Sequence, residues 1–160
     1  MKTLRSIFLS TVLLFGMSAA ACSSPERPDP SGGSSNIEQM KPATILITAG
    51  GRTFTASLAD NSSAAALADL LAKGDVTIAM NDYAGMEKVG PLPVTLPRND
   101  RQIDTSAGDL ILYMGNQFVI YYGSNSWSLT RLGRITDATA QELRSALGSG
   151  SVTVTLSLNR

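Results

Sequence analysis

Two polar segments of the chain carry side chains that could do chemistry. The segment NDYAGMEK contains Asn81, Tyr83 and Glu87, and the segment SNSWSLTR contains Trp127 and Arg131. Aromatic rings with a polar edge are favoured binding anchors, and carboxylate and guanidinium groups orient polar ligands. We therefore take these five residues as the candidate ligand-binding set.

Both segments also have a purely structural interpretation. Asn81 can satisfy backbone donors in a turn, while Tyr83 covers the end of the fold. Trp127 can cap the core with its indole N–H bonded to a backbone carbonyl. Arg131 can stack on Trp127 or pair with Glu87, either as a ligand clamp or as a structural tie. The sequence leaves these alternatives open.

Composition excludes several kinds of chemistry. The chain has no histidine, so a Ser–His–Asp triad and a histidine-based zinc site are both impossible. Its 13 basic and 13 acidic side chains balance, so we expect no nucleic-acid partner. The spacing of the acids Asp82, Glu87, Asp104 and Asp109 fits no calcium loop, and a hydrolytic carboxylate pair is not favoured. We expect no metal, no cofactor and no catalytic residue.

The N-terminal segment MKTLRSIFLSTVLLFGMSAAAC has the layout of a secretory signal peptide. Lys2 and Arg5 precede a short apolar run, and small residues lead to Cys22. The apolar run is too short to form a stable membrane-spanning helix. The ending AAAC resembles the lipobox of bacterial lipoproteins, which implies removal of residues 1–21 and lipid attachment at Cys22. The alternative is ordinary signal cleavage that leaves a free thiol near the new terminus.

Residues 22–42 are rich in serine, proline and glycine and predict a flexible tether. Acyl chains on Cys22 would make the membrane a partner through a lipid anchor. A serine follows this cysteine, which resembles the signal for outer-membrane routing. We therefore expect the protein in the bacterial cell envelope, lipid-anchored, at the outer membrane or facing the periplasm.

Residues 43–160 predict one mainly β domain that positions the candidate site. Period-two alternation predicts strands, and a Gly-Gly or Gly-Asn pair between two of them predicts a hairpin turn. Helix-capping residues and leucine stripes predict two short helices. The middle, residues 84–108, is expected to be a long irregular loop. Seven or eight strands in so short a domain suit a closed barrel or a sandwich. The expected elements are a hairpin in TILITAGGRTFTASL, a helix in DNSSAAALADLLAKG, a strand in DVTIAMNDY, a hairpin in DLILYMGNQFVIYYG, a strand in TRLGRI, a helix in DATAQELRSALGSG and a strand in SVTVTLSL.

The segments GDLILYMGNQFVIYYG and NSWSLTRLGRI give the chain a family resemblance. Over about residues 43–158 it resembles the bacterial cyclophilin-like proteins. The resemblance implies a mainly β fold, a closed cyclophilin-like β-barrel with two short α-helices. Cyclophilins are prolyl isomerases, but this chain has no counterpart of their Phe–His–Arg strand motif, and Val119 stands where a phenylalanine is expected. An isomerase needs a donor near the prolyl nitrogen, which Arg131 or Arg98 would have to supply.

The sequence therefore predicts a lipid-anchored envelope protein that is a non-catalytic binding module. We expect it to bind a small ligand or an extended peptide at the mouth of the barrel. The alternative is a peptidyl-prolyl cis-trans isomerase or chaperone of envelope proteins. A third interpretation is an interaction module with a flat surface around Trp127.

Overall fold

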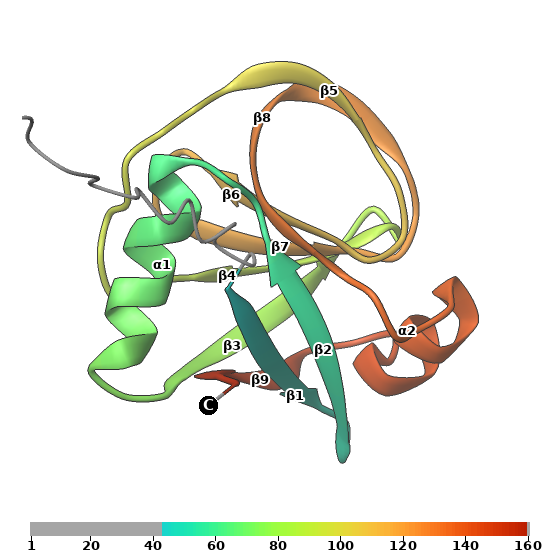
Figure 1. Ribbon diagram of the computed structural model, residues 1–160. Helices are drawn as coiled ribbons and strands as arrows, with labels where there is room; N and C mark the ends of the chain where they lie inside the picture. Colours follow the sequence, from blue (N-terminus) through green and yellow to red (C-terminus); the bar gives the residue numbers. More distant parts are fainter. Residues whose placement is uncertain (1–42, 160) are drawn as a thin grey trace, which may run out of the picture. The chain divides into compact units, whose positions relative to one another are not determined.

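The computed structural model describes residues 43–159. The predicted signal peptide, Cys22 and the tether lie outside these residues. Within them the chain forms nine strands and two helices (Figure 1). In chain order these are β1 (Thr44–Ala49), β2 (Arg52–Leu58), α1 (Ser62–Ala72), β3 (Val76–Tyr83), β4 (Glu87–Pro91), β5 (Arg101–Thr105), β6 (Asp109–Tyr113), β7 (Gln117–Tyr121), β8 (Asn125–Ile135), α2 (Ala140–Leu147) and β9 (Val152–Leu158).

The strands form one antiparallel sheet that closes on itself. Their order is β2-β1-β9-β3-β4-β7-β6-β8-β5, and an additional pairing of β2 with β8 completes a ring. At the junction, Gly133 of β8 lies opposite both Leu58 of β2 and Leu110 of β6. A Cβ atom on Gly133 would collide with the carbonyl oxygen of Ser57, so the close approach of the strands requires glycine. The predicted mainly β, closed fold with two helices is confirmed.

The two halves of the long strand β8 pair with different strands. Its second half pairs with β6 and β2 within the ring, and a register shift interrupts the β6 ladder between Leu110 and Ile111. Its first half, Asn125 to Leu129, pairs only with β5. Bulges of this kind bend a strand and turn its end away from the sheet. In Figure 1 β5 and β8 curve together beyond the other strands; we call this two-stranded ribbon the arch.

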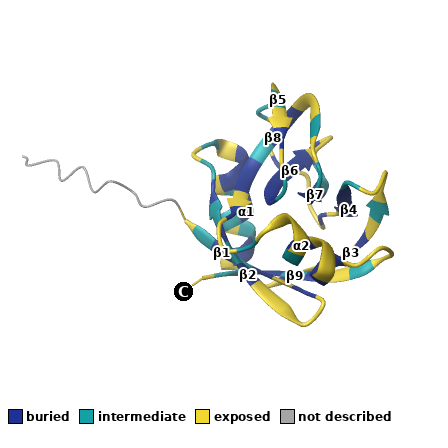
Figure 2. Ribbon diagram, turned by 90° about the vertical axis from the view of Figure 1, so that its right-hand side faces the viewer, coloured by how far each residue is buried: buried dark blue, intermediate teal, exposed yellow. Residues whose placement is uncertain are grey.

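The main core fills the inside of the ring, and both helices pack against it. Phe118 and Ile120 of β7 point inward, as do alternate residues of the other ring strands. The helices add Leu67 and Leu71 from α1 and Leu143 and Leu147 from α2. Figure 2 shows the outer surface of α2 largely exposed. Each helix begins at a residue with a capping side chain, Asn61 for α1 and Thr139 for α2, as the sequence predicts. Neither helix has the length and apolar character needed to cross a membrane.

The expectation of a long irregular loop over residues 84–108 is wrong, because this segment contains β4 and β5. Strand β4 lacks the usual alternation of apolar and polar residues, since Glu87 and Lys88 are both buried. Gly90 takes an inward position where a Cβ atom would collide with the Ile78 side chain. Side chains and backbone from other strands, rather than local sequence preference, therefore fix β4 in the sheet.

Candidate ligand-binding site

A cavity of about 470 Å³ lies between the arch and the outer face of the ring. Its floor comes from β4 and β7, where Val89 lies opposite Val119 and Glu87 lies opposite Tyr121. Val119 and Tyr121 belong to a small second cluster of buried residues, separate from the main core. The sheet here is covered on both faces, which explains why β7 reads as a continuous apolar run. The lining residues are Tyr83, Met86, Glu87, Val89, Tyr113, Val119, Tyr121, Asn125, Trp127 and Leu129.

The arch supplies the wall that faces this floor. Successive side chains of a strand alternate between its faces, so Asn125, Trp127 and Leu129 of β8 point the same way, into the cavity. Strand β5 pairs with β8 along this segment and lies beside it in the ribbon, with Ile103 opposite Trp127. The site predicted at the mouth of the barrel therefore lies on the outer face of the closed sheet.

Three of the large apolar side chains that the structure leaves exposed gather at this cavity. Tyr83 is 62% exposed, Trp127 59% and Tyr113 41%. Large exposed apolar side chains scattered singly are ordinary, but a group around a cavity is typical of a binding site. Trp127 does not cap the core, so the structural interpretation of this residue is wrong. The surface around it is hollowed, so the flat surface of the third interpretation is wrong as well.

Glu87 is the acidic member of the cavity lining. It is only 8% exposed, and its Oε2 atom is buried without a hydrogen-bond partner. Burial raises the pKa of its carboxyl group, an effect that the Tyr121 hydroxyl partly opposes. Burial and the neighbouring Glu87 raise the pKa of Tyr121 to about 12. A buried carboxyl group with a free oxygen is costly to the fold and is therefore a candidate for interaction with a ligand.

Tyr83, Glu87 and Trp127 share the cavity, whereas the structure places Asn81 and Arg131 beside it. Cross-strand pairing puts Asn81 and Arg131 at the two ends of one row on the outer face, with Val89, Val119 and Ile111 between them. The Asn81 amide oxygen accepts a hydrogen bond from the Ser151 hydroxyl at 2.7 Å. Arg131 contributes to a separate, smaller cavity of about 200 Å³, together with Arg101 and residues near the start of α1.

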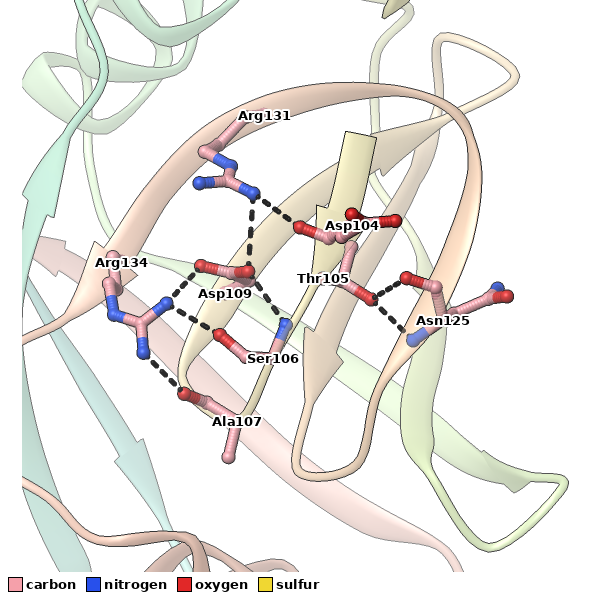
Figure 3. Close-up of polar contacts among 8 residues, drawn as sticks. All are labelled: Asp104, Thr105, Ser106, Ala107, Asp109, Asn125, Arg131 and Arg134. Carbon is pink, nitrogen blue, oxygen red and sulfur yellow. Dashed lines mark hydrogen bonds and ion pairs between the residues drawn. The ribbon is translucent and has the colours of Figure 1, made fainter. Parts of the chain in front are cut away.

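Arg131 holds the base of the arch through a buried acid (Figure 3). Its guanidinium group donates to the Asp104 carbonyl at 3.0 Å and lies 3.3 Å from a carboxylate oxygen of Asp109. Asp109 is 1% exposed, pairs with Arg134 at 2.7 Å and accepts from the Ser106 backbone N–H at 2.9 Å. Arg131 is therefore a structural tie to Asp109; it neither stacks on Trp127 nor pairs with Glu87 in this structure.

A second set of contacts fixes the end of the arch at which Thr105 of β5 lies opposite Asn125 of β8. The Thr105 hydroxyl donates to the Asn125 carbonyl at 3.1 Å, and the Asn125 N–H donates back to this hydroxyl at 2.9 Å. The Asn125 side-chain amide donates to the Tyr121 hydroxyl at 3.2 Å. This last bond ties the arch directly to the floor of the cavity. The walls of the cavity are therefore held in place before any ligand binds.

The remaining arginine considered for isomerase chemistry is also engaged elsewhere. Arg98 pairs with Asp100, and neither residue lines the cavity. Of the ten lining residues none is basic. Within residues 43–159 no three acidic or cysteine side chains gather as metal ligands would.

The sequence identified three lining residues and missed seven. The lining residues outside the predicted set are Met86, Val89, Tyr113, Val119, Tyr121, Asn125 and Leu129. One available signal was the run FVIYY, whose lack of alternation predicts a strand covered on both faces and hence an outer layer. The partner that forms this layer is β5, which lies within the segment expected to be a loop.

Comparisons with known proteins agree with this architecture. The solution structure of the hypothetical protein AF2241 from Archaeoglobus fulgidus is similar, with a TM-score of 0.56 and 14% sequence identity over 73% of this chain and 95% of that one. At this identity the similarity shows the fold alone. No curated protein matches the sequence. The model of the cyclophilin-like family matches residues 47–157, which is most of the chain and includes every residue that lines the cavity. The chain belongs to the cyclophilin-like family.

Proposed function

We propose that this protein binds a small molecule in the cavity beneath the arch. The observation that carries the proposal is the gathering of Tyr83, Tyr113 and Trp127 around a cavity with one buried acid, Glu87. A volume of about 470 Å³ lies within the range of pockets that hold small ligands. Apolar walls with a few polar groups are the usual composition of such pockets.

Binding fits the cavity better than isomerase catalysis does. Prolyl isomerisation needs a donor aimed at the prolyl nitrogen, and arginine is the usual choice. Arg131 and Arg98 are paired with Asp109 and Asp100, and both lie outside the cavity lining. The polar groups that do face a ligand belong to Glu87, Asn125, the tyrosines and the Trp127 indole.

Trp127 is the only tryptophan of the chain, so its fluorescence reports on this cavity alone. We would titrate the full chain with 2-phenylethanol and 2-phenylethylamine, one neutral and one charged aromatic probe. At least one is expected to change the emission of Trp127 saturably. In the variant Val89→Phe, a ring fills part of the cavity and binding is lost.

Val94→Phe is the matched control, because Val94 is exposed and lies outside the lining. It should bind the probes as the unchanged chain does. Failure of both probes to bind contradicts the proposal, as does equal binding by the Val89→Phe variant. Faster cis–trans isomerisation of a proline peptide, lost in Val89→Phe, would support the isomerase instead.

We further propose that the protein acts at the membrane of the bacterial cell envelope, anchored by acyl chains on Cys22. The support is the arrangement of signal peptide, AAAC ending and polar tether in the sequence. Growth of cells with radioactive palmitate should label the protein, and Cys22→Ala should abolish the label. Undiminished labelling of the Cys22→Ala variant contradicts the anchor.

A further inference from the structure

The charged side chains that line the cavity indicate which kind of ligand it binds. Glu87 is its one acidic side chain, and no basic side chain is among the lining residues. Lys88, the neighbour of Glu87, points to the opposite face of β4. There its ammonium group is fully buried, donating to Asp82 at 2.8 Å and to the Gly150 carbonyl at 2.7 Å. The Glu87 carboxylate therefore has no cationic partner among the described residues.

The surroundings of Glu87 are aromatic as well as apolar. Tyr83 and Tyr121 lie opposite Glu87 on the two neighbouring strands, so all three side chains share one row on the outer face. Tyr113 and Trp127 add two further rings to the same cavity. Aromatic faces attract cations through their quadrupoles, and rings grouped around a carboxylate are suited to an ammonium group.

The unpaired carboxylate of Glu87 and the aromatic rings around it thus both favour a ligand with an ammonium group. An ammonium group would give the Glu87 carboxylate, which lines the cavity, a charge-assisted hydrogen bond, and such a bond is stronger than one between neutral groups. A carboxylate or phosphate ligand would instead meet a like charge in a poorly solvated site. The apolar lining from Val89, Val119 and Leu129 suits the hydrocarbon part of the ligand.

We propose that the ligand is an organic cation, a protonated amine on a compact apolar body, with its ammonium group at Glu87 and its apolar part against Trp127. This inference rests on the proposed function, since it assigns a charge to the ligand of the same cavity.

The test compares 2-phenylethylamine with 2-phenylethanol, which have the same shape and differ in charge, by titration calorimetry and Trp127 fluorescence. The full chain should bind the amine at least about ten-fold more tightly than the alcohol, which corresponds to ~1.4 kcal/mol. In Glu87→Gln the ratio of the two dissociation constants should fall to about one. Phenylacetate should bind more weakly than the alcohol.

Glu142→Gln is the matched control, because it removes one acidic charge at an exposed site on α2. It should preserve the preference for the amine. Equal affinity for amine and alcohol in the unchanged chain would overturn the cation assignment and leave the cavity as a binding site for neutral ligands. A preference that survives in Glu87→Gln would overturn the role of Glu87. If neither the amine nor the alcohol binds, the proposed function itself is overturned.

Discussion

Replacing Glu87 with glutamine should make the folded protein more stable at neutral and mildly alkaline pH. The carboxyl group is 8% exposed and one of its oxygens has no partner. A buried polar group without a hydrogen bond costs about 1–3 kcal/mol, and a charged one costs more. Glutamine keeps the shape and removes the charge. We therefore expect Glu87→Gln to gain about 1 kcal/mol near pH 8, or about 4 °C in Tm.

The stability gained by Glu87→Gln should depend on pH. Because burial raises the pKa of Glu87 above its ordinary value of 4.5, the folded state binds more protons than the unfolded state in the window just above that value. The stability of the unchanged chain therefore falls as the pH rises from about 4.5 through the raised pKa. Near pH 4 the group is protonated in the folded state, and the advantage of Glu87→Gln should largely disappear.

Urea unfolding of both chains at several pH values measures this difference. Glu142→Gln is the control, and we expect it to lower the stability at neutral pH, whereas Glu87→Gln should raise it. Hydrogen bonds from Thr139 and Arg52 lower the pKa of Glu142, so its carboxylate stabilises the fold at neutral pH, and this contribution is lost as the pH falls through the lowered pKa. A Glu87→Gln variant that is less stable than the unchanged chain near pH 8 would refute the reasoning, because Glu87 would then have favourable partners.

Three further predictions concern the framework around the cavity. Asp109→Asn removes the buried partner of two arginines and should cost about 3 kcal/mol in urea unfolding, and a cost below about 1 kcal/mol would contradict that role. Asp82→Asn leaves the ammonium group of Lys88 buried without its anion, so it should lower Tm more than Lys88→Met, which removes the buried charge. The reverse order would show that the buried ammonium group does not need Asp82. Gly133→Ala should impair folding, measured by circular dichroism, because its Cβ would collide with the backbone of β2, whereas Gly150→Ala meets no atom within 4 Å; equal stability of the two variants would argue against closure of the ring at that point.

Local features of the fold could be predicted because their causes lie close together in the chain. The capping box of Thr139 and Glu142 spans one turn of helix, and the turn at Gly115 needs positive φ at that residue. Strands with clear alternation, such as β9, also follow from their own residues. Closure of the sheet came from the family resemblance rather than from any one segment.

The arch could not be predicted in the same way, because contacts between distant segments hold it. Strand β5 has little apolar character of its own and is defined by pairing with the first half of β8. The place of Arg131 near Trp127 in the sequence favours a ligand clamp, but the buried Asp109 binds its guanidinium group. The charge of Glu87 makes it a candidate from the sequence, but only the structure shows that its carboxyl group is buried and unpaired at a cavity.

A crystal structure of the chain with 2-phenylethylamine tests the central claim most directly. We predict density for the probe beneath the arch, with its ring against the Trp127 indole and its nitrogen about 3 Å from a carboxylate oxygen of Glu87. An arch collapsed onto Val119, leaving no space for the probe, or a probe bound only elsewhere, would contradict the account.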